Sequence, residues 1–105
     1  MVVVENLVRR RARIGCDIVS ISRFKNWSDR RVERVFGSLV CEQWIDRNRS
    51  ITYLAGRWAI AESVFKAIGE WEGCVDDPGG RPCSQYCDVT VTHQRDVCYA
   101  FAIQL

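Results

Sequence analysis

The feature that most constrains the fold is the run of residues 54–69, in which apolar side chains recur at helical spacing. At about 100° per residue, these side chains form one main arc and a second group that covers much of the opposite side. The main arc holds Leu54, Trp58, Ala61, Phe65 and Ile68, and the second group holds Ile60, Val64 and Ala67. Because a helix that is apolar on most sides must be buried on most sides, the run predicts a central helix around which the domain packs.

Two charged residues, Glu62 and Lys66, stand one turn apart beside the main apolar arc. So close to buried surface, each needs a partner. In one interpretation they form an ordinary i,i+4 ion pair, which stabilises a helix by about 0.2–0.5 kcal/mol. In the other, Glu62 holds a cation and Lys66 neutralises an anion bridged by that cation. The second interpretation requires another carboxylate from elsewhere in the chain.

Asp17 is the candidate for that carboxylate. It lies within residues 13–19, a short β-prone run of mostly apolar residues that predicts a strand. An ionised carboxylate in apolar surroundings must be paired, bound to a metal or protonated. The alternative is an Asp at the end of a strand that caps the next turn.

Length and composition restrict the class of protein. With 105 residues the chain is expected to be one small domain with a thin core, for which oligomerisation is plausible. A net charge of +2 does not by itself indicate nucleic-acid binding. No signal peptide or membrane-spanning run is recognisable, so we expect a cytoplasmic location and no membrane partner. We therefore expect the six cysteines to be reduced, and the Cys83 and Cys87 spacing lacks the second pair of a zinc site.

The remaining segments predict short helices and a turn region. Ser22 is a suitable N-cap for a helix that carries Phe24, and a further helical stretch begins at Ser28 and closes at Gly37. Residues 38–48 predict another short helix, and residues 47–50 break the pattern before the central helix. The Gly- and Pro-rich residues 70–82 predict a loop or tight hairpin.

Three blocks of sequence, in order, resemble one known family. They are Gly15-Cys-Asp-Ile-Val followed by Ser20-Ile-Ser-Arg-Phe, then Leu54-Ala-Gly-Arg-Trp-Ala with Glu62 and Lys66, and lastly Thr90-Val-Thr-His followed by Tyr99-Ala-Phe-Ala. Together they resemble holo-(acyl carrier protein) synthase, of the 4'-phosphopantetheinyl transferase family. The resemblance extends from residue 14 to the C-terminus, so residues 1–12 are expected to be a flexible N-terminal extension and residues 13–105 a single domain.

The resemblance implies a fold, a reaction and an assembly. The fold is α+β, with a small antiparallel sheet packed on a long central helix, of the trimeric type. The reaction moves 4'-phosphopantetheine from coenzyme A to a serine of apo acyl carrier protein, with Mg²⁺ as cofactor. A homotrimer with active sites in clefts between protomers is expected.

The resemblance also implies roles for particular residues. Asp17 and Glu62 bind the metal, Lys66 stabilises the departing phosphate, and Glu62 or a metal-bound water deprotonates the serine. The coenzyme A ligands are Arg47, Arg49, Arg57, Lys66, Gly69 and His93, and the surface for the carrier's acidic helix is Arg23, Arg30, Arg31 and Arg34. Arg57, at about 140° from Glu62 around the helix, is expected to serve a different side or another subunit.

The sequence departs from the family in two places. Ala61 stands where the family has a Lys, which reduces the positive charge available for phosphate, and residues 83–88 are brief where the family has a strand and a helix. A degenerate, non-catalytic trimer is therefore one alternative, although Asp17, Glu62 and Lys66 are retained. A small nucleic-acid-binding module is another; it would place aromatic residues beside arginines on one exposed surface, whereas Trp44 and Trp58 fall in helical patterns that predict core packing.

Overall fold

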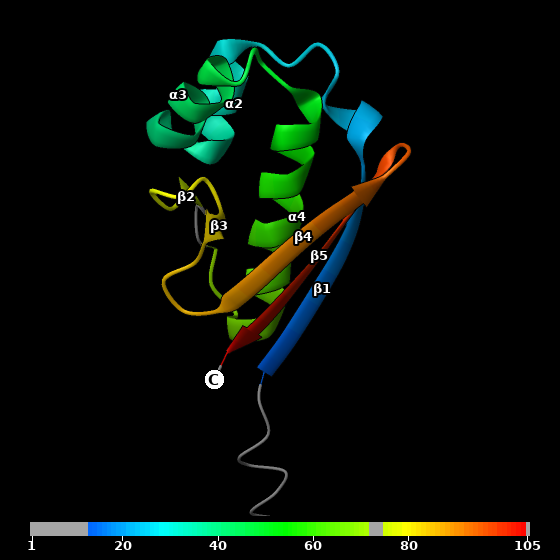
Figure 1. The fold of residues 1–105 in the computed structure, drawn as a ribbon, viewed down its shortest axis with the longest axis vertical. Coiled ribbons are helices and arrows are strands. Elements are labelled where there is room, and N and C mark those ends of the chain that lie inside the picture. The colour runs from blue at the N-terminus through cyan, green and yellow to red at the C-terminus, as the bar shows by residue number, and fades with distance from the viewer. Residues whose placement is uncertain (1–12, 72–74, 105) are drawn as a thin grey trace, which may run out of the picture.

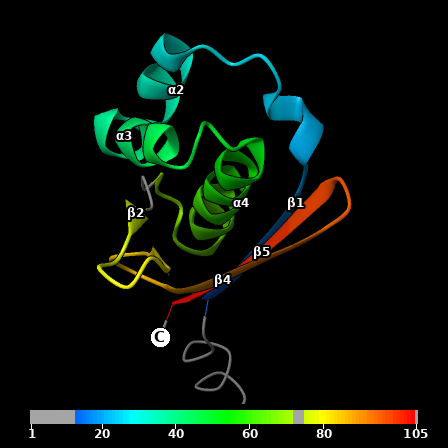
Figure 2. The same ribbon diagram turned by 45° about the horizontal axis from the view of Figure 1, so that its top comes forward.

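The computed structural model describes residues 13–71 and 75–104. In chain order its elements are β1 (Arg13–Ser20), the 3-10 helix η1 (Ile21–Phe24), α2 (Asp29–Phe36), α3 (Ser38–Asp46), α4 (Ile51–Ile68), β2 (Val75–Asp76), β3 (Pro82–Cys83), β4 (Asp88–Gln94) and β5 (Val97–Gln104) (Figure 1). Figure 2 shows α4 between the sheet on one side and the α2 and α3 pair on the other. The expected N-terminal extension, residues 1–12, lies outside the described residues.

The main sheet has three antiparallel strands in the order β1-β5-β4. Asp17 of β1 and Val91 of β4 both lie opposite Ala100 of the central strand β5. A second, two-stranded sheet pairs β2 with β3, as the predicted tight hairpin requires. The prediction of an α+β fold with a small antiparallel sheet on a long central helix is confirmed.

Glycine and alanine let the sheet approach α4 closely. A Cβ atom at Gly15 would lie 1.8 Å from the carbonyl oxygen of Ser63, so only glycine permits β1 to cross the helix here. Ala100 and Ala102 of β5 are fully buried against the same helix. The Oγ atom of Ser63, buried at the contact, lies 2.7 Å from the Ala59 carbonyl oxygen and 3.1 Å from that of Ala100, so its one hydrogen is shared between helix and sheet.

The central helix begins three residues earlier than the apolar pattern, at Ile51, because the Ser50 hydroxyl caps it by accepting a bond from the Tyr53 amide. It ends at Gly69, which adopts the left-handed conformation with φ of 80°. Ten of its 18 residues are buried, which confirms the predicted burial on most sides. Phe65 is an exception: it lies on the predicted apolar arc but is 47% exposed.

The prediction that Ser22 caps a helix is wrong. The chain forms only the single 3-10 turn of η1 there; Ser22 lies inside it, and Ser20 occupies the N-cap position without a side-chain capping bond. Ser28 does cap α2, by accepting a bond from the Arg31 amide, and Gly37 ends it. The helix predicted over residues 38–48 ends at Asp46 as α3.

The described part of the chain contains no helix that is both long and apolar enough to cross a membrane. Four cysteines at described positions, Cys16, Cys41, Cys83 and Cys98, are free thiols.

Candidate active site

The structure brings Asp17 of β1 and Lys66 of α4 together. The Lys66 Nζ atom donates to Asp17 Oδ1 at 3.0 Å and to the Cys16 carbonyl oxygen at 2.9 Å. The Asp17 side chain is 16% exposed, whereas the Lys66 side chain is half-exposed. Asp17 can lie this close to α4 because Gly15, two residues earlier on the same face of β1, permits the backbone contact.

This geometry excludes two of the simpler interpretations. Asp17 lies inside β1, three residues before its end, and is therefore not a strand-end cap. Among the ion pairs between described residues, Lys66 is paired with Asp17 and not with Glu62. The i,i+4 ion pair on α4 is thus not formed, because the Lys66 side chain extends across to β1.

The hydrogen bond from Lys66 also affects its ionisation. The pKa of Lys66 is raised above its ordinary value, chiefly by this bond to Asp17. Burial opposes the rise, and the negative charge of Glu62 adds a little to it. Lys66 therefore stays cationic at neutral pH. Its charge is available to an anion that approaches from the exposed side.

The donor set suits a hard divalent cation. In the described residues no group of three or more His, Cys, Asp or Glu side chains forms a metal cluster. Mg²⁺, however, usually takes only one or two protein carboxylates and fills its remaining positions with phosphate and water. Asp17 Oδ2 accepts no hydrogen bond from another described residue, and Glu62 is partly buried one helical turn before Lys66. The two carboxylates, Asp17 and Glu62, are therefore of the donor type that Mg²⁺ takes.

A second polar cluster lies on another side of α4. Asp76 of β2 is paired through one carboxylate oxygen with Arg57 and through the other with Arg47. Both guanidinium groups lie 4.7 Å from the centre of the Tyr53 ring. The Tyr53 hydroxyl donates at 2.8 Å to the side-chain oxygen of Gln43. Arg57 thus faces β2 and not the Asp17 site, in agreement with the 140° offset around the helix.

Arg57 is 7% exposed, and its Nε and Nη1 atoms have no hydrogen-bond partner among the described residues. Arg49 is paired with Asp29, at 2.8 Å, on the surface. The other residues expected to bind coenzyme A are apart from these arginines: Gly69 ends α4, and His93 is exposed near the end of β4. His93 lies opposite Cys98, which lies opposite Val19, so two strand spacings separate it from β1. In the single chain the six residues do not form one site.

The expected docking arginines lie on η1 and α2, and two of them stack on tryptophans. The Arg23 guanidinium lies 4.6 Å from the centre of the Trp58 ring, and that of Arg31 lies 4.0 Å from Trp27. Arg30 and Arg34 are exposed. Arginine beside aromatic residues is the arrangement expected of the nucleic-acid alternative, but Trp58 and Trp27 also pack against the core.

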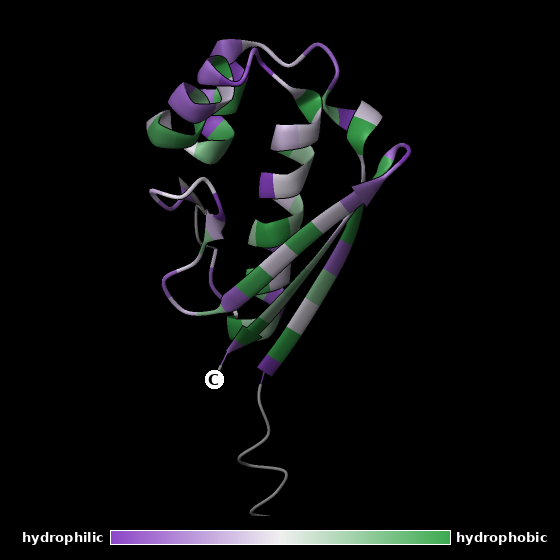
Figure 3. Ribbon diagram, in the orientation of Figure 1, coloured by the Kyte–Doolittle hydropathy of each residue, from purple (hydrophilic) through white to green (hydrophobic). Residues whose placement is uncertain are grey.

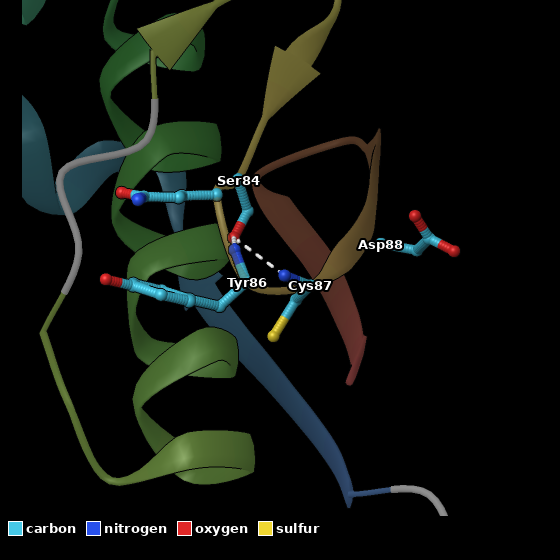
Figure 4. Close-up of a pocket in the computed structure, with 5 residues that line it drawn as sticks. Ser84, Tyr86, Cys87 and Asp88 are labelled. Atoms are coloured by element: carbon cyan, nitrogen blue, oxygen red, sulfur yellow. Dashed lines mark hydrogen bonds between the residues drawn. The ribbon is translucent and has the colours of Figure 1, made fainter. Parts of the chain in front are cut away.

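A surface pocket of about 210 Å³ lies in the loop before β4 (Figure 4). It is lined by Ser84, Gln85, Tyr86, Cys87 and Asp88. The Ser84 hydroxyl oxygen accepts bonds from the amides of Tyr86 and Cys87. None of the residues expected to be functional lines this pocket.

Sequence reasoning missed three polar residues: Asp76, Ser63 and Asp96. Asp76 lies in a run typical of a turn, and its two arginine partners come from the residue after α3 and from α4. Asp96 lies in the β4 to β5 turn and binds Ser20 and Ser22. A lone serine on a helix or an Asp in a turn gives no signal of such distant partners.

Together the fold and the site define a small α+β protein with a carboxylate and lysine site suited to a phosphate group. Known proteins identify it further. The family model of the 4'-phosphopantetheinyl transferase superfamily matches residues 13–98. The holo-(acyl carrier protein) synthase of Mycoplasma mobile is 33% identical over 94 residues, which cover 87% of each chain. That of Staphylococcus saprophyticus is 34% identical over 88 residues, or 70% of this chain and 76% of the relative.

Solved structures of synthases from other organisms have a similar fold. The synthase of Chronobacterium ammoniagenes in complex with coenzyme A superposes with a TM-score of 0.72 at 20% identity, covering 91% of this chain and 98% of the other. The synthase of Mycobacterium tuberculosis gives 0.60 at 26% identity, covering 89% and 96%. The chain belongs to the 4'-phosphopantetheinyl transferase superfamily and is an enzyme of that family, which confirms the resemblance seen in its sequence.

Proposed function

We propose that this enzyme transfers the 4'-phosphopantetheine moiety of coenzyme A to a serine of apo acyl carrier protein, in a Mg²⁺-dependent reaction that gives the holo carrier. The observation that supports it most is the Asp17 and Lys66 pair beside Glu62, in a chain whose relatives are named for this reaction. The serine hydroxyl attacks the phosphorus that bears the pantetheine arm, and the diphosphate bond breaks to release adenosine 3',5'-bisphosphate.

The chain's own residues provide position and charge. Asp17 and Glu62 would hold Mg²⁺, and the bound ion would neutralise charge on the diphosphate. Asp17 and the Cys16 carbonyl oxygen hold the ammonium group of Lys66 in place, and its positive charge would stabilise the departing phosphate. The serine proton passes to a base, for which Glu62 is the candidate on α4.

We propose Arg47, Arg49, Arg57, Gly69 and His93, with Lys66, as ligands of coenzyme A. The two buried guanidinium nitrogens of Arg57 that have no partner among the described residues support an anion site there. Because Asp76 already binds Arg47 and Arg57, a phosphate would share these arginines with that carboxylate or displace it. Since the six residues are separated in the single chain, they would form a complete site only with a second protomer.

A homotrimer is supported by the face of the sheet opposite α4. Four large apolar side chains are exposed there: Ile14, Ile18, Phe101 and Ile103. A second and third copy would cover these side chains and bring neighbouring protomers together at the sites.

The transfer itself is tested by incubating the protein with coenzyme A, Mg²⁺ and apo carrier, and measuring the carrier's mass. We expect the wild type to add phosphopantetheine, EDTA to stop it, and Asp17→Asn and Glu62→Gln to reduce it by at least about a hundredfold, as for loss of groups that bind transition-state charge. Glu42→Gln, an exposed carboxylate of α3, is the control. An inactive wild type would favour the degenerate trimer; a normal rate in Asp17→Asn would refute the metal assignment.

Carrier docking on Arg23, Arg30, Arg31 and Arg34 is tested separately. Arg23→Glu should raise the KM for the carrier and scarcely change the KM for coenzyme A, and added salt should have the same effect because exposed charges are screened within about 10 Å at 0.1 M. Equal losses for both substrates would place Arg23 in the catalytic cleft instead. Tight oligonucleotide binding with a steep salt dependence, without turnover of coenzyme A, would support the nucleic-acid alternative.

A further inference from the structure

Asp96 makes an unusual set of bonds from the turn between β4 and β5. Its carboxylate accepts from the Ser20 hydroxyl at 2.5 Å, from the Ser22 hydroxyl at 2.9 Å and from the Ser22 amide at 2.9 Å. Its carbonyl oxygen accepts from the Ile21 amide at 2.8 Å. One residue of the hairpin turn therefore binds three consecutive residues at the junction of β1 and η1.

The register of the sheet places Asp96 at this junction. Val97, the first residue of β5, lies opposite Ser20, the last residue of β1. Asp96 precedes Val97 and so lies just beyond the end of the β1 and β5 ladder, where η1 begins. Arg95 adopts a positive φ of 56°, and the turn of Arg95 and Asp96 closes the hairpin next to that end.

The segment that Asp96 holds has little stability of its own. η1 is a single 3-10 turn of four residues, and its N-cap makes no side-chain capping bond. Isolated turns of this kind are too short to be stable without tertiary contacts. The conformation of η1 therefore depends on Asp96 on one side and on packing of Phe24 in the core on the other.

This segment joins two of the proposed functional groups. Asp17 lies three residues before Ser20, and Arg23 directly follows Ser22. Arg23 stacks on Trp58, so its guanidinium is presented at a defined place above α4. A change in η1 would move Arg23 away from Trp58, while Asp17 would remain held by the β1 ladder and by Lys66.

We propose that Asp96 is a positioning residue for carrier docking: by binding Ser20, Ile21 and Ser22 it fixes η1 so that Arg23 is presented to the acidic surface of the carrier protein. This inference rests on the proposed function and assigns a role to a residue outside both the proposed metal site and the proposed docking surface. It predicts that Asp96 affects use of the carrier and not use of coenzyme A.

The variant Asp96→Ala removes the carboxylate. The matched control is Arg95→Asn in the same turn. Asn tolerates the positive φ at this position, and no ion pair of a described residue involves Arg95. Loss of hydrogen bonds to a charged group is worth roughly tenfold or more in an equilibrium constant. We expect Asp96→Ala to raise the KM for the carrier about tenfold, with the KM for coenzyme A changed less than about twofold, and Arg95→Asn to match the wild type.

A merely structural role for Asp96 would lower kcat and change both KM values together, which would overturn the proposal. The decisive measurement combines Asp96→Ala with Arg23→Ala. If Asp96 acts through Arg23, its removal should change the carrier KM little once Arg23 is absent. Independent, multiplied losses in the double variant would also overturn it.

A readout besides activity comes from amide hydrogen exchange of the wild type and Asp96→Ala. The Ser22 amide donates to the Asp96 carboxylate, so its exchange should accelerate in the variant. The Ile21 amide donates to the Asp96 carbonyl oxygen, which the variant keeps, and the amides of α4 keep wild-type protection. Unchanged exchange at the Ser22 amide would refute the proposed bond to the carboxylate. A wild type that transfers phosphopantetheine with an Asp96→Ala variant of unchanged carrier KM would refute this inference alone and leave the proposed function intact.

Discussion

Along β1 and β5 the two faces of the sheet are both mostly apolar, but they differ in the size of their side chains. The face against α4 carries Gly15, Val19, Cys98, Ala100 and Ala102, of which the non-glycine residues are all buried hydrophobics. The opposite face carries Ile14, Ile18, Phe101 and Ile103, of which Ile14 and Ile18 are each 65% exposed. Along β4, by contrast, Figure 3 shows hydrophobic residues alternating with more polar ones.

The difference follows from what each face contacts. Small residues let the backbone of β1 touch the backbone of α4, which leaves no room for a side chain at Gly15. The opposite face has no neighbour within the described chain. Its large apolar side chains would stabilise an assembly in which other copies of the chain cover them. One face is therefore completed by folding, and in the proposed trimer the other is completed by association.

The largest effect is expected on the face against α4. In Gly15→Ala the new Cβ would lie 1.8 Å from Ser63 O and 2.9 Å from Ala67 N, both backbone atoms that cannot rotate away. We expect a loss of roughly 3–5 kcal/mol in the free energy of unfolding, or failure to fold. Gly56→Ala is the control, since its Cβ would meet only Val91 Cγ2 at 3.7 Å. Urea unfolding measures both; a stable Gly15→Ala would show that the backbone contact is not required.

The second effect concerns the opposite face. Ile18→Asp places a charge among its apolar side chains without disturbing the packing against α4. We expect a folded protein that scatters light as a monomer, where the wild type gives three times the chain mass, and that loses transfer by at least about tenfold because association is coupled to the site. Leu39→Asp, an exposed apolar residue on α3, is the control. A wild-type monomer with full activity would contradict the trimer.

The covered face shows how far the sequence predicts the structure. Periodicity predicted α4 and its burial, because apolar spacing on a helix is a local property. The same pattern could not tell that Phe65 is exposed, since it records apolarity and not the presence of a neighbour. Ser22 misled for a related reason: a capping residue gives only a local preference, and here Asp96, from the far end of the chain, binds Ser22 instead.

The sequence predicted which residues form the candidate site but not which of them contact one another. Asp17, Glu62 and Lys66 stood out because charges near apolar runs need partners. The bond between Lys66 and Asp17, 49 residues apart, depends on how β1 crosses α4 and so could not be read from the helix, where Glu62 was the nearer choice. Asp76 was missed because its Asp-Pro-Gly-Gly surroundings indicate only a turn.

A smaller effect is expected from Ser63, which joins α4 to the covered face. Its hydroxyl is the only polar side-chain contact from α4 to the Ala100 carbonyl within the described residues. Ser63→Ala should lower the free energy of unfolding by about 0.5–1.5 kcal/mol, the usual net value for an intramolecular hydrogen bond. Ser38→Ala, on an exposed position of α3, should stay within about 0.5 kcal/mol of the wild type in the same urea titration. A neutral Ser63→Ala would mean that close packing alone holds the helix to the sheet.

The smallest effect is expected from the Lys66 and Asp17 pair on the face that α4 covers. The bond to Asp17 raises the pKa of Lys66 in the folded protein above its ordinary value, which in unfolded chains is about 10.4. A raised folded pKa stabilises the protein fully below the unfolded pKa, and this stabilisation is lost as pH rises through the folded pKa. The difference in urea midpoint between the wild type and Lys66→Met should therefore be constant from pH 7 to about 9 and shrink above about 10.4. Because the Lys66 side chain is half-exposed, solvent screens the pair and the change will be small.

Taking the difference between the two proteins removes titrations that they share, such as those of tyrosines. A difference that grows in favour of the wild type between pH 7 and 9 would mean that the pKa of Lys66 is lowered and not raised, and Lys66 would then be a poor cation for the departing phosphate.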